Sequence, residues 1–210
     1  PEYNPRLDMA IENAKSDNVP KDNIEKAIKK GTGELDEGEG RYEDATYEAY
    51  GPGGIAYFIE VTTNNYNRTV GDIRYILNEH GGNLGTDGSV DYLFEQKGMI
   101  KIPSEGLDED DFMLEAIDAG AEDIENEDGF FEVYTKRNEL FEVRSNLEDG
   151  GYNIKNAKLV RIPMTEVEVD HETALSNLKL MDELDNNDDV SNIFTNMKMD
   201  DQTLAAAEEL

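Results

Sequence analysis

The stretch that decides the fold reads YEAYGPGGIAYFIEVTTNNYNRTVGDIRYILNEHGGNLGTDGSVDYLFEQKGMIKI, from Tyr47 to Ile102. Near its start, Gly51-Pro52-Gly53-Gly54 predicts a tight turn, because proline presets φ at the first central position and glycine tolerates a positive φ at the second. The apolar run from Ile55 to Thr63 is typical of a strand that is buried on at least one face. Two antiparallel strands joined by this turn are therefore expected.

The rest of the stretch predicts a helix and two more strands. Apolar residues recur at helical spacing from Val70 to Leu77, and Gly81-Gly82 is placed to end the helix. Two short strands are expected at residues 90–95 and 99–102, with a turn at residues 96–98.

A glycine-punctuated loop, Asn83 to Ser89, lies between the helix and these strands. Its glycines allow close approach of the backbone, and successive amides can form an anion-binding nest. Asn83, Gly85 and Gly88 are therefore candidate residues for contact with a partner. The alternative is a β-connection that needs positive φ, and it is favoured because no strand-to-helix phosphate motif surrounds the loop.

The flanking segments complete an α+β prediction. Residues 104–163 show an αββαβ pattern, and a last helix and strand follow them. The central stretch lacks a closing helix and strand, so this terminal pair is expected to return to it. We predict an amino-terminal helical region with a linker, followed by two ferredoxin-like α/β domains, one inserted into the other. The expected boundaries are 1–41 for the helical region and linker, 42–103 plus 164–200 for the discontinuous domain, 104–163 for the inserted domain, and 201–210 for a tail.

Five short motifs occur along the chain in a fixed order: Asn4-Pro5-Arg6-Leu7, Pro20-Lys21-Asp22-Asn23-Ile24, Tyr50-Gly51-Pro52-Gly53-Gly54, Asn67-Arg68-Thr69-Val70 and Gly81-Gly82-Asn83-Leu84-Gly85. Together they resemble the YebC/PmpR family over essentially the whole chain. Bacterial members are called probable transcriptional regulators, and a mitochondrial relative is a translational activator of a cytochrome oxidase subunit. The resemblance implies a helical domain and two α/β domains. It also implies a further basic helical segment ahead of Asn4, so the chain is expected to be a fragment.

The charge is distributed unevenly along the 210 residues. The formal net charge is −30, yet residues 1–31 hold equal numbers of basic and acidic side chains. The whole excess lies in the remaining chain, whose surface is expected to repel phosphate backbones. Adaptation to high salt and an interaction surface for a basic partner are the two explanations. The first is favoured, because the acid is spread along the chain rather than gathered in blocks.

Basic residues of the amino-terminal helices are therefore the candidate phosphate contacts. On the second helix, Lys26, Lys29 and Lys30 cluster opposite the apolar face. The alternative is an ordinary solvated face. The family resemblance and the acidity of the rest of the chain make the two interpretations equally favoured. The full candidate set for nucleic-acid binding is Arg6, Lys15, Lys21, Lys26, Lys29, Lys30 and Arg68.

Catalytic and metal-binding motifs are absent from the sequence. It contains no Walker, nucleophile-elbow or zincin pattern, and His80 and His171 are isolated. The acidic run 185–189 has Val190 and Asn196 where a calcium loop needs glycine and glutamate. An enzyme, a metal, a cofactor and a small-molecule substrate are therefore not expected. The absence of cysteine and of any membrane-spanning run favours a cytoplasmic protein, and a monomer is expected.

Three functional hypotheses follow from this sequence. The first is a DNA-binding transcriptional regulator, as the resemblance implies. The second is a translation factor that contacts ribosomal RNA or the ribosome. The third is an acidic protein–protein interaction module that binds no nucleic acid.

The charge of −30 generates a prediction about salt. Raising KCl from 50 mM to 1 M shortens the screening length to about 3 Å and relieves self-repulsion. In a chain of this size, relieving about 1 kcal/mol of repulsion raises the Tm by about 2–4 °C. Calorimetry across the salt series is expected to show a rising Tm. A flat or falling Tm would contradict salt adaptation and favour an acidic interface.

Overall fold

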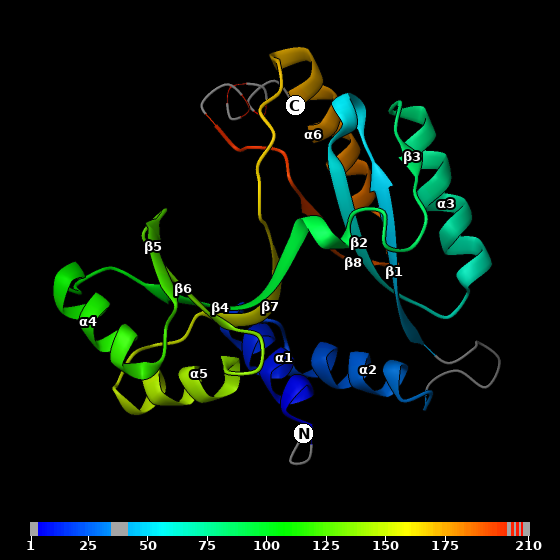
Figure 1. The fold of residues 1–210 in the computed structure, drawn as a ribbon. Helices are drawn as coiled ribbons and strands as arrows, with labels where there is room; N and C mark the ends of the chain where they lie inside the picture. Colours follow the sequence, from blue (N-terminus) through cyan, green and yellow to red (C-terminus); the bar gives the residue numbers. More distant parts are fainter. Residues whose placement is uncertain (1–3, 35–41, 201–202, 204, 206, 208–210) are drawn as a thin grey trace. The chain divides into compact units, whose positions relative to one another are not determined.

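Figure 1 shows the computed structural model of the chain, which describes residues 4–34, 42–200, 203, 205 and 207. Helices and two four-stranded sheets make up two compact units. Unit 1 comprises the residues up to Lys29 together with Gln96–Arg161, and unit 2 comprises Lys30–Glu95 and the residues from Ile162 onward. The fold is therefore α+β, as expected.

The sheet of unit 2 has the order β3-β1-β2-β8. Its strands are β1 (Glu43–Tyr50), β2 (Ala56–Thr63), β3 (Asn83–Leu84) and β8 (Val190–Thr195). The turn between β1 and β2 is the predicted one, with Gly53 at φ 72°. β8 pairs antiparallel with β2, which confirms that the end of the chain returns to the central sheet.

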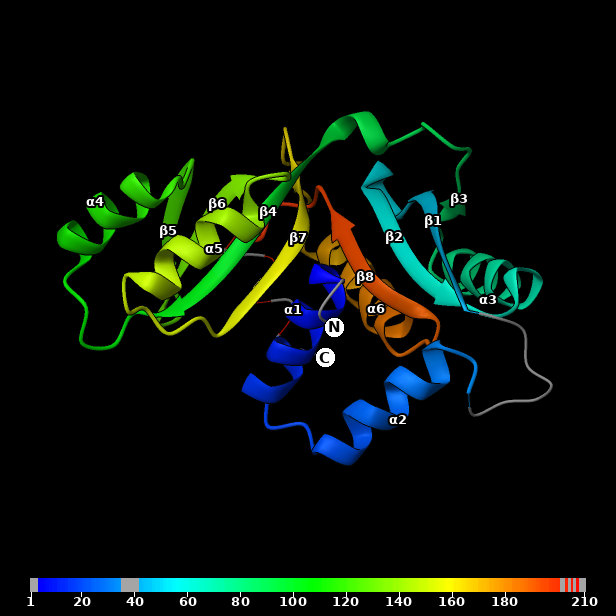
Figure 2. The same cartoon turned by 90° about the horizontal axis from the view of Figure 1, so that it is seen from below.

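Two helices cover one face of this sheet, α3 (Tyr66–Glu79) and α6 (His171–Asp185) (Figures 1 and 2). Their apolar residues pack with Tyr57, Ile59 and other strand residues in one buried cluster. The Tyr57 hydroxyl donates a hydrogen bond to Asn177 Oδ1 of α6 at 2.9 Å. Burial raises the pKa of this tyrosine, so the hydroxyl keeps its proton and the bond.

The opposite face of the unit 2 sheet is covered by residues 90–94, through which the chain leaves this sheet. Ala56 and Phe58 of β2 pack against Val90 and Phe94, on either side of the short helix η2 (Asp91–Leu93). The Phe58 and Phe94 rings meet edge to face, with centroids 6.5 Å apart. Residues 90–93, predicted to begin a strand, therefore form this cover instead.

Most of unit 1 is a β-α-β-β-α-β succession, compatible with a ferredoxin-like unit. Its elements are β4 (Phe94–Pro103), α4 (Glu109–Ala119), β5 (Asp123–Glu127), β6 (Phe130–Lys136), α5 (Leu140–Asp149) and β7 (Asn156–Pro163). The sheet order is β5-β6-β4-β7. Phe112 of α4 stacks on Phe131 of β6 at 4.3 Å between centroids, within one buried cluster.

The first helix, α1 (Pro5–Ser16), belongs to unit 1. Met9 is buried in the unit 1 core. The Asn13 side chain donates to the Ala157 carbonyl at 2.9 Å and accepts from the Ala157 amide at 3.1 Å. These bonds attach α1 to β7 within unit 1.

The two units divide before residue 103, where the sequence predicted a boundary. Residues 94–103 form one continuous strand, and the part from Gln96 onward belongs to unit 1. Gly98 lies inside this strand, where a Cβ would come within 2.4 Å of Thr135 Oγ1 and 2.7 Å of Leu140 Cβ. Close packing on the backbone, and not a turn, explains this glycine.

The discontinuous unit accordingly runs from Lys30 to Glu95 and resumes at Ile162. The expected linker lies largely outside the described residues, as does most of the expected tail at 201–210. Thr203 is described and buried, and its hydroxyl donates to the Lys198 carbonyl at 2.9 Å.

Candidate nucleic-acid interface

The second helix, α2 (Lys21–Gly31), carries the lysine face predicted from the sequence. Lys26, Lys29 and Lys30 are exposed and lie three and four residues apart, which places them on one side of the helix. No residue of α2 is buried, and Ile24 and Ile28 are only half-buried. The helix therefore presents most of its surface, lysines included, to solvent.

Two of the other amino-terminal candidates form ion pairs on their own helices. Lys15 pairs with Glu12 at 2.8 Å, and Lys21 pairs with Glu25 at 3.6 Å. Arg6 is exposed on the first turn of α1. By their spacing on α2, Lys26, Lys29 and Lys30 are the most compact group of cations among these candidates.

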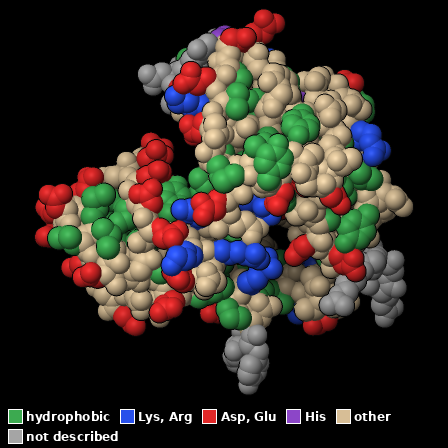
Figure 3. Space-filling model, viewed as in Figure 1, with side chains coloured by type: hydrophobic (Ala, Val, Ile, Leu, Met, Phe, Trp, Pro, Cys, Tyr) green, Lys and Arg blue, Asp and Glu red, His purple; other side chains and the backbone are tan. Residues whose placement is uncertain are grey.

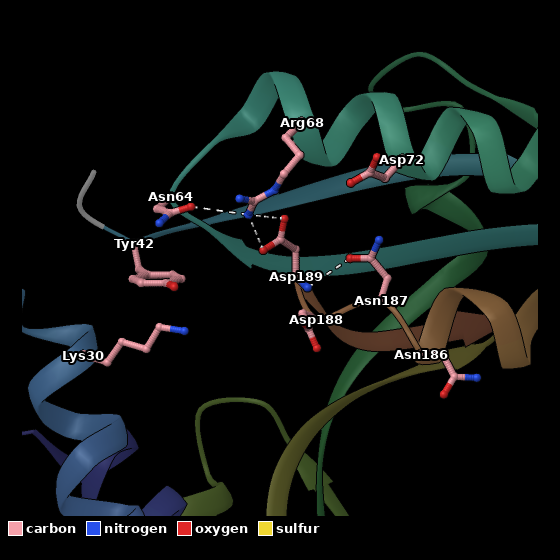
Figure 4. Close-up of a pocket in the computed structure, with 9 residues that line it drawn as sticks. All are labelled: Lys30, Tyr42, Asn64, Arg68, Asp72, Asn186, Asn187, Asp188 and Asp189. Carbon is pink, nitrogen blue, oxygen red and sulfur yellow. Dashed lines mark hydrogen bonds and ion pairs between the residues drawn. The ribbon is translucent and has the colours of Figure 1, made fainter. Parts of the chain in front are cut away.

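Two of the predicted residues, Lys30 and Arg68, line the same pocket of unit 2, which has a volume of about 570 Å³ (Figure 4). The remaining lining residues are Tyr42, Asn64, Asp72, Asn186, Asn187, Asp188 and Asp189. The Lys30 ammonium lies 5.2 Å from the centroid of the Tyr42 ring, a cation–π distance. Figure 4 shows Lys30 on one side of this ring and Asn64 with Arg68 on the other.

Arg68 is held by the buried carboxylate of Asp189. Its Nη2 donates to both Asp189 oxygens at 2.8 Å, and Asp189 is 7% exposed. The Thr69 hydroxyl donates to Asp189 Oδ2 at 2.6 Å. The Arg68 side chain nevertheless remains 49% exposed, so part of the guanidinium faces the pocket.

These contacts set the ionisation of Asp189. Burial acts to raise the pKa of its carboxyl group, but the hydrogen bonds from Thr69 and Arg68 outweigh burial and hold the pKa below its ordinary value. The charged pair joins the start of α3 to the loop between α6 and β8. Arg68 therefore has a structural role. A phosphate bound by Arg68 would have to share its guanidinium group with Asp189.

The charges that line the pocket are nearly balanced. Lys30 and Arg68 stand against three carboxylates, of which Asp189 is already neutralised by Arg68. Such a pocket attracts a polyphosphate only weakly, but its amides and tyrosine suit a polar ring that both donates and accepts hydrogen bonds.

Gly88 of the glycine loop and the two residues Val90 and Asp91 just after the loop form an anion nest with their amides, and the protein fills it with its own carboxylate. Glu48 of β1 is 9% exposed. Its carboxylate accepts from the amides of Gly88 at 2.6 Å, Val90 at 2.5 Å and Asp91 at 2.9 Å. The Gly85 amide donates to the Glu48 carbonyl at 2.7 Å. This arrangement supports the β-connection interpretation for Gly85 and Gly88, and Asn83 pairs with Tyr50 in the sheet.

Sequence reasoning missed Tyr42, Glu48 and Asp189. Asp189 was considered only as part of a calcium-like run, and nothing local indicates a partner 121 residues away. For Glu48, the signal in the sequence was that it is the only carboxylate in the expected strand at residues 47–50. His80 is isolated in the sequence, but its ring Nε2 lies 2.6 Å from a carboxylate oxygen of Glu183 on α6.

The described part of the chain has neither a metal-binding cluster nor a membrane-spanning helix. No group of three or more His, Cys, Asp or Glu side chains there is arranged to hold a metal ion. No helix among those residues has the length and apolar character needed to cross a bilayer.

The Arg68–Asp189 pair generates a prediction about acid stability. At pH 7, Asp189→Asn is expected to lower the free energy of unfolding by about 1–3 kcal/mol, because Arg68 and Thr69 lose a charged acceptor. Because the folded pKa is depressed, this stabilisation is present above the unfolded pKa of about 3.9 and is lost as pH falls through the folded value. Urea denaturation between pH 7 and pH 3 should show the gap in unfolding free energy between the parent chain and Asp189→Asn closing as the pH falls. Asp188→Asn, an exposed neighbour, is the control, and a gap that is independent of pH would contradict the account.

The filled nest generates a second prediction. Glu48→Gln places an amide NH₂ against backbone donors, so a loss of about 1–3 kcal/mol in the free energy of unfolding is expected. Hydrogen exchange should accelerate at Gly88, Val90 and Asp91, while the exposed control Glu79→Gln leaves these amides unchanged. If added inorganic phosphate slowed exchange at these amides in the parent chain, the nest would be open to an external anion and our interpretation would be wrong.

Comparison with known proteins places the chain in a family. The profile described as "TACO1/YebC second and third domain" matches residues 42–197, and "TACO1/YebC protein N-terminal domain" matches residues 1–34. A "Probable transcriptional regulatory protein" of Persephonella marina is 50% identical over 207 residues, which are 97% of this chain and 82% of that protein. A protein of the same description from Chlorobaculum tepidum is 46% identical over 210 residues, covering 100% of this chain and 83% of the relative.

A solved structure agrees with these sequence matches. The crystal structure of a conserved hypothetical protein from Aquifex aeolicus superimposes with a TM-score of 0.85 at 45% identity, covering 94% of this chain and 81% of that one. The sequence and fold comparisons agree over nearly the whole chain, and the chain belongs to the YebC/TACO1 family.

Proposed function

We propose that this chain is a gene-expression factor that binds nucleic acid through Lys26, Lys29 and Lys30, the lysine face of α2. Its relatives carry the name probable transcriptional regulatory protein, so a regulatory role is the starting point and DNA is the first target. Phosphate contacts supply most of the sequence-independent affinity for DNA, and they need exposed cations.

The observation that carries this proposal is the lysine face within an acidic chain. Three cations lie within two turns of a helix that has no buried residue. The amino-terminal 31 residues are electrically balanced, whereas the remainder holds the whole net charge of −30. A phosphate backbone would therefore meet its least repulsion along this helix.

The pocket beside Lys30 extends the proposal from phosphate to base. Lys30 covers one side of the Tyr42 ring, and the other side faces the pocket with Asn64. A base stacked on an aromatic ring contributes about 1–3 kcal/mol in single-stranded complexes. Asn64 and Asn187 line the same pocket, and their amides are the groups that would bond the edge of such a base.

The pocket favours a second candidate target, RNA of the ribosome. Stacking on Tyr42 requires an unpaired base, which loops of structured RNA present and intact duplex DNA does not. A role in translation would follow from a clear preference for ribosomal RNA over duplex DNA.

Charge reversal tests the proposal. The triple variant Lys26→Glu, Lys29→Glu and Lys30→Glu is expected to weaken binding at least about tenfold, and to lower the slope of log K against log salt by about 1 for each lysine. Fluorescence anisotropy on duplex DNA and on a ribosomal RNA fragment, from 50 to 200 mM KCl, measures both quantities.

A control must carry the same net charge. Arg74→Glu, Lys158→Glu and Lys179→Glu change three exposed residues elsewhere and add the same negative charge. This variant should keep most of the parent affinity. Equal losses in the two variants would mean that only overall repulsion changed, and the lysine face of α2 would not be the site.

A further inference from the structure

The outward side of α4 exposes two aliphatic residues. Leu114 is 65% exposed and Ile117 is 59% exposed, and they lie one turn apart on the helix. Phe112 and Ala116, on the inward side, are buried in the unit 1 core. Figure 3 shows hydrophobic side chains gathered over α4, with acidic side chains around them. Core packing therefore explains the inward residues and leaves Leu114 and Ile117 without a structural role.

The charge around this face is of one sign. Between Lys101 and Lys136 the sequence has no Lys, Arg or His and has 13 Asp and Glu residues. Asp110, Asp111, Glu115 and Asp118 are exposed on α4 itself. Among the ion pairs of the described residues, none involves an α4 carboxylate. Glu115 accepts a hydrogen bond from the Tyr152 hydroxyl at 2.6 Å, and the charge of the four carboxylates is not balanced by these ion pairs.

Helix stability does not account for all of these carboxylates. Asp108 caps α4 by accepting from the Asp111 amide at 3.1 Å, and acids in the first turn complement the helix dipole. Asp118 lies at the other end, where a negative charge opposes the dipole and no basic residue offsets it. Salt adaptation would explain additional acid but not exposed Leu114 and Ile117 among it.

We propose that the outward face of α4, which we call the α4 face, binds a basic amphipathic segment of another protein. The α4 face consists of Leu114 and Ile117 with the carboxylates of Asp110, Asp111, Glu115 and Asp118. The partner segment buries one or two apolar side chains on the aliphatic pair and places Lys or Arg against the carboxylates. This surface is independent of nucleic-acid binding by α2.

Charge excludes the other occupants of the α4 face. A second copy of the chain would bring its own acidic α4 against this one. Like charges that meet across an interface cost roughly several kcal/mol. Phosphate backbones and anionic lipid surfaces carry the same sign as the α4 face and are repelled by it. Only a cationic partner gains from both the aliphatic pair and the acidic rim.

The test uses the full chain and a fluorescein-labelled amphipathic Lys/Leu helical peptide. A scrambled peptide of the same composition and a Glu/Leu peptide of the same pattern are the probe controls. The double variant Leu114→Ser and Ile117→Ser should weaken binding of the Lys/Leu peptide about tenfold in anisotropy titrations, which corresponds to about 1.4 kcal/mol. Met164→Ser with Tyr75→Ser, equally exposed apolar residues elsewhere, should change it less than about twofold.

Charge is tested separately with Asp110→Asn and Asp118→Asn. This variant should bind the peptide severalfold more weakly and with a shallower dependence on salt, whereas Asp182→Asn with Asp185→Asn on α6 removes the same charge and should have little effect. Thermal melts of each variant should match the parent, because every substituted side chain is exposed.

Three outcomes would overturn the proposal. One is equal binding of the peptide by the parent and the α4 variants, and another is an equal loss in the α6 control, which would reduce the effect to general attraction. The third is a dimer of the free chain in sedimentation that dissociates in Leu114→Ser with Ile117→Ser, which would make the α4 face an interface between copies.

Discussion

The buried carboxylate of Asp189 ties together parts of unit 2 that are far apart in sequence. It accepts from Arg68 and Thr69 at the start of α3, and from the Thr63 hydroxyl at the end of β2 at 3.3 Å. Asp189 itself immediately precedes β8, the strand that closes the sheet against β2. Removing one member of a buried, charged network leaves the other members without a hydrogen-bond partner, which is costly. The return of the chain to this sheet therefore depends on these bonds. The same bonds fix one wall of the pocket that Lys30 and Tyr42 also line.

Negative charge is the second constraint, and it is distributed unevenly along the chain. A chain of net charge −30 can approach a phosphate backbone only where cations are locally concentrated, as on α2. The acidic stretch between Lys101 and Lys136 has the opposite preference, since it favours cationic partners. A factor with both surfaces could hold a nucleic acid and a basic protein at the same time, which is a useful property in gene expression.

Local pattern predicted much of this fold, and the limits of prediction have physical causes. The Pro52-Gly53 turn, α3 and the αββαβ run of unit 1 follow from periodicity and turn chemistry, and they appear as expected. Gly98 misled the prediction, because a glycine that permits close packing inside a strand cannot be distinguished locally from a turn glycine. Because of this error, the prediction assigned the strand at residues 99–102 to the discontinuous domain, whereas it belongs to unit 1. At the candidate site, spacing predicted the lysine face of α2, but the partners of Arg68 and of the glycine loop are long-range contacts that no local pattern encodes.

Chemical-shift mapping of the isotope-labelled chain tests the central claim most directly. The chain would be titrated with a short duplex DNA and, separately, with a single-stranded RNA at low salt. We expect saturating shifts at the amides of α2 around Lys26, Lys29 and Lys30, with Tyr42 and Asn64 shifting as well when the RNA is added. Shifts that concentrate instead on residues 83–89 or on α4, with α2 unmoved, would contradict the account.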